Sequence, residues 1–88
     1  MAAVTVHLPA SLTAPEPGCE IELEATTVGD AVAQVVARRP RLAARILFEE
    51  RPQVSFVLNG RQLRPSEAMR TGLSHGDRLD FVPPVAGG

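Results

Sequence analysis

One long segment of this chain has the spacing of an amphipathic helix, and that segment constrains the fold more than any other. Its apolar residues recur three and four positions apart and therefore share one face: Val28, Ala31, Val32, Val35 and Val36. Thr27 stands three residues before Asp30, the spacing of an N-cap with an acid in the first turn. Pro40 follows two arginines and stops the helix. The pattern predicts one main helix over residues 28–39.

Four other segments alternate apolar and polar residues, as half-buried strands do. They cover residues 4–8, 20–24, 54–58 and 78–82. Residues 10–18 contain Ser, Thr, Gly and two prolines, which predicts a loop joining the first two strands into an antiparallel hairpin. Asn59-Gly60 predicts a tight turn into residues 61–63. Short helical turns are expected over residues 42–47 and 67–70.

This order of elements predicts an α+β fold of the β-grasp type. The expected sheet is mixed and four- to five-stranded, one main helix crosses it, and the first and last strands are parallel neighbours at its centre. Leu79 and Phe81 are expected to face inward, and Asp80 and Val82 outward. Residues 1–82 then form the globular domain, and residues 83–88 form an extended C-terminal tail.

The composition is that of one small soluble domain. The chain has 88 residues, of which 44% are hydrophobic, and a formal net charge of −1, so no basic surface for nucleic acid is expected. No apolar run approaches the length of a membrane span and no charged-then-apolar leader is visible, so neither a membrane span nor a signal peptide is expected. Cys19 is the only cysteine, which excludes an internal disulfide and suits the reducing cytoplasm.

The last six residues are the most unusual part of the chain. Pro83 and Pro84 fix their φ angles and lack N–H donors, so the chain leaves the last strand in an extended direction. Val85 and Ala86 follow, and Gly87 and Gly88 have no side chains, so this end fits a channel too narrow for any other residue. The pattern indicates a terminal carboxylate presented inside another protein. A frayed terminus is the alternative.

The ending resembles that of the ubiquitin-like sulfur carrier family (MoaD/ThiS-like), which includes the small subunit of molybdopterin synthase and the thiamine sulfur carrier. The residues that carry the resemblance are Gly76-Asp77, the strand with Phe81, and Pro-Pro-Val-Ala-Gly-Gly. Leu-Pro after the first strand, Arg-Pro after the helix and Leu-Asn-Gly in the third strand extend it. The first thirty residues match more loosely.

The resemblance implies a specific chemistry at Gly88. An E1-like adenylating enzyme would use ATP and magnesium to convert the Gly88 carboxylate into an acyl adenylate. Sulfur from a desulfurase or sulfurtransferase would then replace AMP and leave a C-terminal thiocarboxylate. A sulfur-consuming enzyme, such as the molybdopterin synthase large subunit, would use that sulfur. The chain itself would be a carrier and not an enzyme.

Several residues outside the tail are candidates for docking such partners. Val82 is an apolar residue expected to face outward immediately before the prolines, and His7 or Leu58 is expected to extend the same face. Arg78 is a candidate for an acidic rim on a partner, with a solvated strand charge as the alternative. Cys19 is expected to be a small buried hydrophobe, and the two histidines lack the spacing of zinc ligands.

Three classes of function stay open at this stage. The first is the thiocarboxylate carrier, serving molybdopterin synthesis or the synthesis of cysteine, thiamine or another thio-metabolite. The second is a ubiquitin-like modifier joined to other proteins through Gly88. All nine basic residues are arginines, so the modifier could not form lysine-linked chains with itself. The third is a β-grasp interaction domain whose terminus is incidental.

Overall fold

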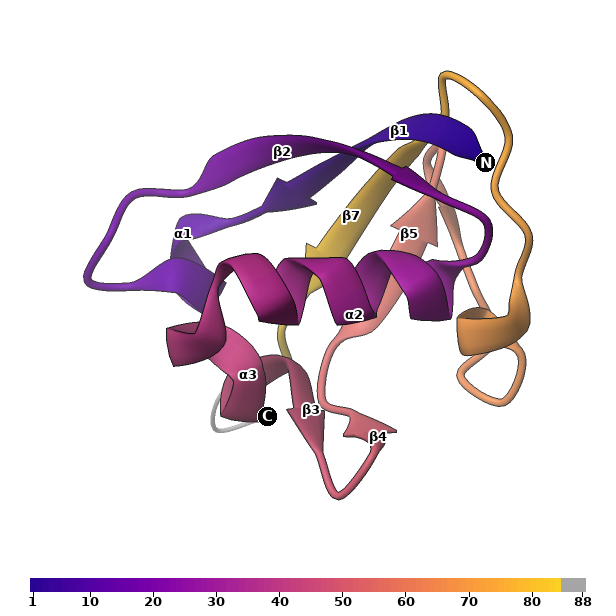
Figure 1. Cartoon of the computed structure of the whole chain (residues 1–88). Coiled ribbons are helices and arrows are strands. Elements are labelled where there is room, and N and C mark those ends of the chain that lie inside the picture. The colour runs from indigo at the N-terminus through magenta and orange to yellow at the C-terminus, as the bar shows by residue number, and fades with distance from the viewer. Residues whose placement is uncertain (85–88) are drawn as a thin grey trace.

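A mixed sheet with one long helix across its face forms the framework of the molecule (Figure 1). The computed structural model describes residues 1–84. The five strands stand in the order β2-β1-β7-β5-β6, and the helix is α2. Their bounds are β1 Ala2–Leu8, β2 Cys19–Ala25, β5 Ser55–Leu58, β6 Arg61–Gln62, β7 Arg78–Val82 and α2 Val28–Arg38.

The pairing of the strands confirms the predicted β-grasp topology. β1 and β2 form an antiparallel hairpin, and β1 lies parallel to β7 at the centre of the sheet, with Val6 opposite Leu79. β5 pairs antiparallel with the other side of β7, where Phe56 stands opposite Phe81. Leu79 and Phe81 are fully buried, as their alternation with Asp80 and Val82 predicts. The last strand of the chain is therefore held on both sides by hydrogen-bonded neighbours.

Helix α2 begins as the sequence predicts. The Thr27 hydroxyl accepts a hydrogen bond from the Asp30 backbone N–H at 3.1 Å. The Asp30 carboxylate in turn accepts one from the Thr26 N–H at 3.0 Å, so two backbone donors at the helix start are satisfied. The apolar face of α2 is buried against the sheet through Val28, Ala31, Val32 and Val35. This layer between helix and sheet is the hydrophobic core.

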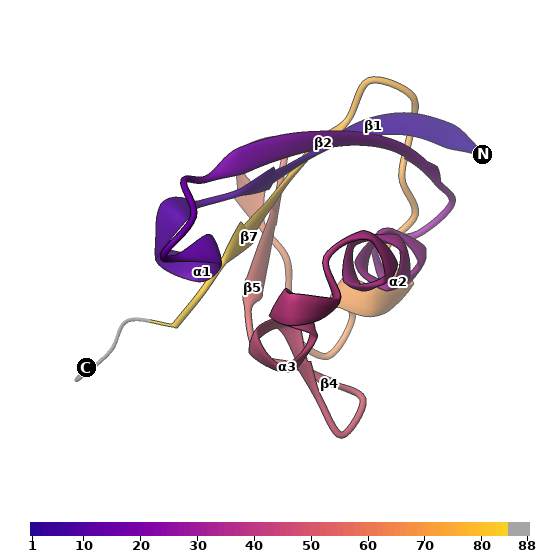
Figure 2. The same cartoon turned by 60° about the vertical axis from the view of Figure 1, so that its left-hand side comes forward.

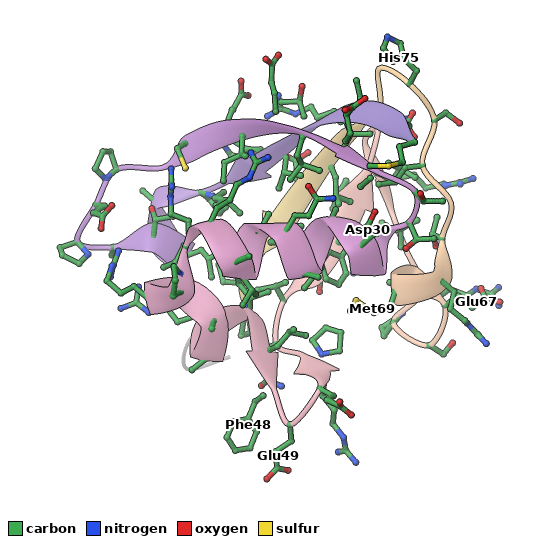
Figure 3. The ribbon with its side chains drawn as sticks, in the orientation of Figure 1. Asp30, Phe48, Glu49, Glu67, Met69 and His75 are labelled. Carbon is green, nitrogen blue, oxygen red and sulfur yellow. The ribbon has the colours of Figure 1, made fainter. Side chains whose placement is uncertain are left out.

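The N-terminal end of α2 packs closely against the segment that leads into β7. That segment includes the short helix η2 (Ala68–Arg70), which falls within the predicted turn over residues 67–70. Figure 3 shows Asp30 at this end of α2 and Met69 on the neighbouring segment. A Cβ atom on Gly29 would lie 2.9 Å from the carbonyl oxygen of Met69. The close approach therefore depends on Gly29 having no side chain.

The segment predicted as a loop between β1 and β2 contains a turn of helix, α1 (Ala10–Thr13), so that prediction was incomplete. The Thr13 hydroxyl lies 3.0 Å from the Glu16 carbonyl oxygen and 3.1 Å from that of Pro17. Arg45 donates hydrogen bonds to the carbonyl oxygens of Leu12 and Ala14, at 3.0 and 2.7 Å. The Arg45 contacts come from a side chain about thirty residues away, which no local sequence pattern reveals.

The chain between α2 and β5 also differs in part from expectation. The predicted helical turn over residues 42–47 is present as η1 (Pro40–Leu42) followed by α3 (Ala43–Ile46). Leu47 instead begins a two-stranded hairpin of β3 (Leu47–Phe48) and β4 (Arg51–Pro52), which was not predicted. This hairpin is separate from the main sheet.

A sharp turn precedes β6, as predicted, and another precedes β7. Asn59 and Gly60 have φ angles of 51° and 85°, the left-handed conformation that a two-residue hairpin requires. Gly76, in the turn before β7, has a φ of 88°. Across residues 1–84, no helix combines the length and the apolar character needed to cross a bilayer.

Candidate functional site

Strand β7 anchors the start of the C-terminal segment in the core. Phe81 is fully buried and packs edge-on against Phe56, with ring centroids 5.1 Å apart and an interplanar angle of 87°. Val82 ends the strand, and Pro83 and Pro84 follow without regular secondary structure. Figure 2 shows the end of β7 leaving the body of the molecule on the side where α1 lies. The predicted tail residues Val85, Ala86, Gly87 and Gly88 lie outside the described residues.

A broad open hollow of about 720 Å³ lies at the base of this segment. Its floor comes from the outer face of β1, β7 and β5, and one wall comes from the chain at the start of α1. Most of its surface is apolar, with one histidine and one aspartate as its charged or ionisable groups. The residues that line it are His7, Pro9, Ser11, Val57, Asp80, Phe81, Val82, Pro83 and Pro84. Of the surfaces among residues 1–84, this one lies directly beside the start of the C-terminal segment.

The structure brings together two of the predicted docking residues, Val82 and His7, in this hollow. The Val82 side chain is one of the few large apolar groups among residues 1–84 that stay exposed, at 42%. His7 is half-buried on the outer face of β1, as its alternation with Val6 and Leu8 predicts. Whether these residues contact a partner stays a prediction.

Leu58 does not belong to this face, and that expectation was wrong. Its side chain is buried in the core, and the residue pairs with the buried Leu79. Because side chains alternate along a strand, the residue that shares the face of Val82 and His7 is the neighbouring Val57. Counting from the buried Phe56 would have found it.

A chain of polar contacts crosses the outer face of the sheet beside the hollow. His7 Nδ1 lies 3.0 Å from Asp80 Oδ1, and Arg78 Nη2 lies 3.3 Å from the same oxygen. Arg78 Nη1 donates to Glu20 Oε2 at 2.7 Å. The hydrogen bond to Glu20, and to a smaller extent the one to Asp80, raises the pKa of the Arg78 guanidinium above its ordinary value. Arg78 is thus paired within its own sheet, and its predicted contact with an acidic partner is untested.

Asp80, Pro9 and Ser11 also line the hollow, and none of the three was predicted from the sequence as a docking residue. Asp80 was placed correctly on the outer face, but its position opposite His7 depends on the parallel register of β1 and β7. Pro9 and Ser11 reach the hollow because α1 turns the chain back toward β7. No local signal in the sequence identifies either contact.

Cys19 lies away from this site. It is half-buried and packs against the core, close to the predicted behaviour of a small hydrophobe. Cys19 lines a separate hollow of about 190 Å³ together with Arg39 and Arg41, although both arginines are distant from it in the sequence. Among residues 1–84, no group of three or more His, Cys, Asp or Glu side chains is placed to hold a metal ion.

The fold and the geometry of the last strand agree with a comparison of the chain with known protein families. The model of the family described as the ThiS family matches residues 12–88, which includes α2, the whole of β7 and the glycine pair. The chain belongs to the ThiS family. The match confirms the family membership expected from the end of the sequence, and it extends over residues 12–88.

Two curated relatives and one solved structure are similar to this member of the ThiS family. Small archaeal modifier protein 3 of Haloferax volcanii is 39% identical over 64 residues, 70% of each chain. A proposed sulfur carrier protein of Archaeoglobus fulgidus is 34% identical over 89 residues, 98% of this chain and 99% of that protein. A chain of the BexX/CysO complex of Amycolatopsis orientalis superposes with a TM-score of 0.76 at 30% identity, covering 98% of this chain and 100% of that one. The protein is thus a small carrier or modifier of the ubiquitin-like type.

Proposed function

We propose that this ThiS-family protein is a sulfur carrier whose Gly88 carboxylate becomes a thiocarboxylate. Residues 1–82 form the body that partners dock on, and residues 83–88 form the tail that enters their active sites. Gly88 is the sulfur-accepting residue. Gly87, Ala86, Val85, Pro84 and Pro83 are the residues that partners recognise along the tail. The chain supplies no catalytic group of its own.

One observation carries this proposal: the last strand is fixed at the centre of the sheet and then leads directly into two prolines. β7 is paired on both sides, and Phe81 locks it to the core. Pro83 lacks the N–H needed to continue a sheet ladder, and strand pairing ends at Val82. A firmly held strand followed by an unpaired segment suits a carrier, because the body can be gripped while the end is delivered.

The chemistry requires a partner because a carboxylate is ionised at neutral pH and resists nucleophilic attack. An E1-like adenylating enzyme with ATP and Mg²⁺ joins AMP to the Gly88 carboxyl group and releases pyrophosphate. The terminal sulfur of a persulfide, held by a desulfurase or sulfurtransferase, then bonds to the acyl carbon as AMP leaves. A second thiol then attacks the donor's sulfur in this acyl disulfide, forms a disulfide with it, and releases the thiocarboxylate as the leaving group. The electrostatic stabilisation of these steps belongs to the partner enzymes.

For the recipient of the sulfur, we propose the large subunit of molybdopterin synthase. Support comes from the tail sequence alone, Pro-Pro-Val-Ala-Gly-Gly, which resembles that of the small subunit of this enzyme. The CysO chain found in complex with BexX shows that a protein of similar fold and sequence forms an assembly with another protein. Delivery to cysteine, thiamine or thio-metabolite synthesis is the alternative, and it uses the same terminal chemistry.

A second candidate function is a protein modifier conjugated through Gly88. The observation that favours it is the 39% identity to small archaeal modifier protein 3 of H. volcanii. Conjugation starts from the same acyl adenylate, so the two functions differ only in the nucleophile that takes the acyl group. Absence of lysine limits the modifier to single attachments, because no lysine on this chain can accept a second copy.

Intact mass spectrometry of the protein isolated from its own cells tests these candidates together. A carrier yields a free species heavier than the carboxylate form by the difference between a sulfur and an oxygen atom, and alkylation of the thiocarboxylate shifts that species. A modifier yields conjugates that survive denaturation and carry a Gly88 isopeptide bond. If the protein carries neither when its sulfur pathways are active, both candidates fail.

A further inference from the structure

The hairpin of β3 and β4 carries an aromatic side chain that is not part of the hydrophobic core. The Phe48 side chain is 58% exposed, whereas the other two phenylalanines, Phe56 and Phe81, are buried in the core. Figure 3 shows Phe48 and Glu49 at the end of this hairpin, pointing away from α2 and the main sheet. The ring is accessible to another protein, and aromatic side chains are enriched at protein interfaces.

The turn that presents Phe48 is built from unfavourable residues. Phe48 pairs with Arg51, and the two residues between them, Glu49 and Glu50, have φ angles of 52° and 64°. Such turns favour Asn and Gly because a Cβ atom resists the left-handed conformation. The chain uses that favoured pair, Asn59-Gly60, in its other two-residue hairpin. Side chains at positions 49 and 50 are therefore retained against the conformational preference of the turn.

Glu49 and Glu50 outnumber the exposed Arg51 beside them, so the hairpin tip carries a net negative charge. Both glutamate side chains are exposed, and neither forms an ion pair within residues 1–84. An exposed phenyl ring followed directly by two free carboxylates is complementary to an apolar pocket with arginine or lysine at its rim. Buried aromatic anchors of this kind supply much of the affinity of protein interfaces, and surrounding charges supply orientation.

The hairpin lies at the same end of the molecule as the exit of the tail. β4 ends at Pro52, three residues before Ser55, and Ser55 pairs with Val82, the last residue of β7. Figure 1 shows β3 and β4 below the sheet, at the end toward which β7 runs. In Figure 2, the hairpin and the end of β7 diverge from this shared end. A protein large enough to receive the tail can reach both.

We propose that Phe48, Glu49 and Glu50 form a second docking contact with a partner that receives the C-terminal tail. The partner presents an apolar pocket for the Phe48 ring, flanked by basic side chains that face the two glutamates. This proposal rests on the proposed function, because it takes the tail-binding partner as its occupant. A second copy of this chain is disfavoured, since a symmetric contact between hairpin tips would bring four carboxylates together.

The first experiment identifies the occupant by photo-crosslinking in the full chain. A benzoyl-phenylalanine at position 48 is compared with the same probe at the exposed Arg64, on the segment after β6, and with one at Pro84 within the tail. The expected result is that positions 48 and 84 crosslink to one protein and position 64 does not. Crosslinks from position 48 that join only two copies of this chain, or a protein that position 84 never reaches, overturn the proposal.

The second experiment measures the affinity of the purified crosslinked partner for matched variants. Phe48→Ala is expected to raise Kd about tenfold or more. Glu49→Gln with Glu50→Gln is expected to weaken binding and to flatten its dependence on salt. Glu49→Asn with Glu50→Gly is expected to raise Tm by roughly 5 °C while it weakens binding, because the turn relaxes as the charges are lost. The control is Arg64→Ala, which should bind like the wild type.

The two proposals fail in different ways. If the wild type forms a thiocarboxylate but Phe48→Ala, with an unchanged Tm, binds the partner within about twofold of the wild type, the hairpin is no docking contact and the carrier function stands. If the wild type forms no thiocarboxylate, the carrier function fails whatever the hairpin binds. A gain in stability without any loss of binding in the Asn-Gly variant also overturns the hairpin proposal.

Discussion

His7 and Asp80 face each other across the parallel pair of β1 and β7, with His7 Nδ1 3.0 Å from Asp80 Oδ1. These two residues are 73 positions apart in the sequence, and they meet because the first and last strands are neighbours in the sheet. Both line the hollow from which the C-terminal segment departs. The parallel register of β1 and β7 therefore places this contact on the surface that a partner would meet.

Asp80→Asn tests whether this pair matters for docking more than for folding. The carboxylate is 23% exposed and its partners, His7 and Arg78, both reach solvent, so the free energy of unfolding should change by about 1 kcal/mol or less. The rate of acyl-adenylate formation by the adenylating enzyme should fall by more than this change in stability explains, because the variant changes the charge of the docking surface. Chemical denaturation and pyrophosphate release measure the two effects. Glu24→Gln, on the outer face of β2, is the control and should leave both unchanged.

Gly88→Ala tests the tail directly. The sheet, the helices and the core are all formed by residues 1–84, so the free energy of unfolding should change by less than about 0.5 kcal/mol. Thiocarboxylate formation should be lost, since a methyl group does not fit a channel that accepts bare backbone. Intact mass spectrometry reports the product, and Ser66→Ala serves as a substitution at an exposed position of the body. Normal thiocarboxylate formation by Gly88→Ala would contradict the proposed role of the tip.

Gly29→Ala tests the close packing of α2 against the chain near Met69. The added Cβ would lie 2.9 Å from the Met69 carbonyl oxygen, so the backbone must move apart, at a cost of roughly 1–3 kcal/mol. Gly72→Ala is the matched control because a Cβ there meets no atom within 4 Å. That variant should be neutral or stabilising by roughly 0.4–1 kcal/mol. Equal stability of the two variants in urea denaturation would show that the contact yields easily.

Arg45→Ala tests what holds the wall of the hollow. It removes the hydrogen bonds to the carbonyl oxygens of Leu12 and Ala14, which should cost about 1 kcal/mol for this exposed donor. Amide exchange at Leu12 and Ala14 should accelerate, because α1 is only four residues long and depends on such contacts. Arg64→Ala, on the segment after β6, is the control for the loss of an exposed arginine side chain. Unchanged exchange in α1 would show that Thr13 and the Arg41 hydrogen bond to the Thr13 carbonyl oxygen hold the turn without Arg45.

The main elements were predictable because their signals are local and repeat. Alternation gave β7 with the bounds observed, and Thr27 with Asp30 gave the start of α2 through a cap that involves only neighbouring residues. Alternation also placed His7, Asp80 and Val82 on the outer face. Leu58 was misplaced through its register, because a shift of one residue moves a side chain to the other face.

The parts that escaped prediction depend on contacts between distant residues. α1 is too short to show a period, and it is held by Arg45 from another helix. The β3–β4 hairpin has glutamates where turn propensity favours Asn and Gly, so no turn signal marks it. Cys19 lies near Arg39 and Arg41 only because β2 and the end of α2 converge.

By itself, the sequence determined the order and type of the main elements and the tail that follows Val82, because hydrophobic period, caps and prolines act within a few residues. Only the tertiary structure decided which outward residues share the base of the tail, and that the exposed Phe48 hairpin lies at the same end of the molecule. The physical reason is the pairing of distant strands. The parallel register of β1 and β7 brings His7 to Asp80, and the antiparallel pairing of Ser55 with Val82 brings the hairpin toward the tail.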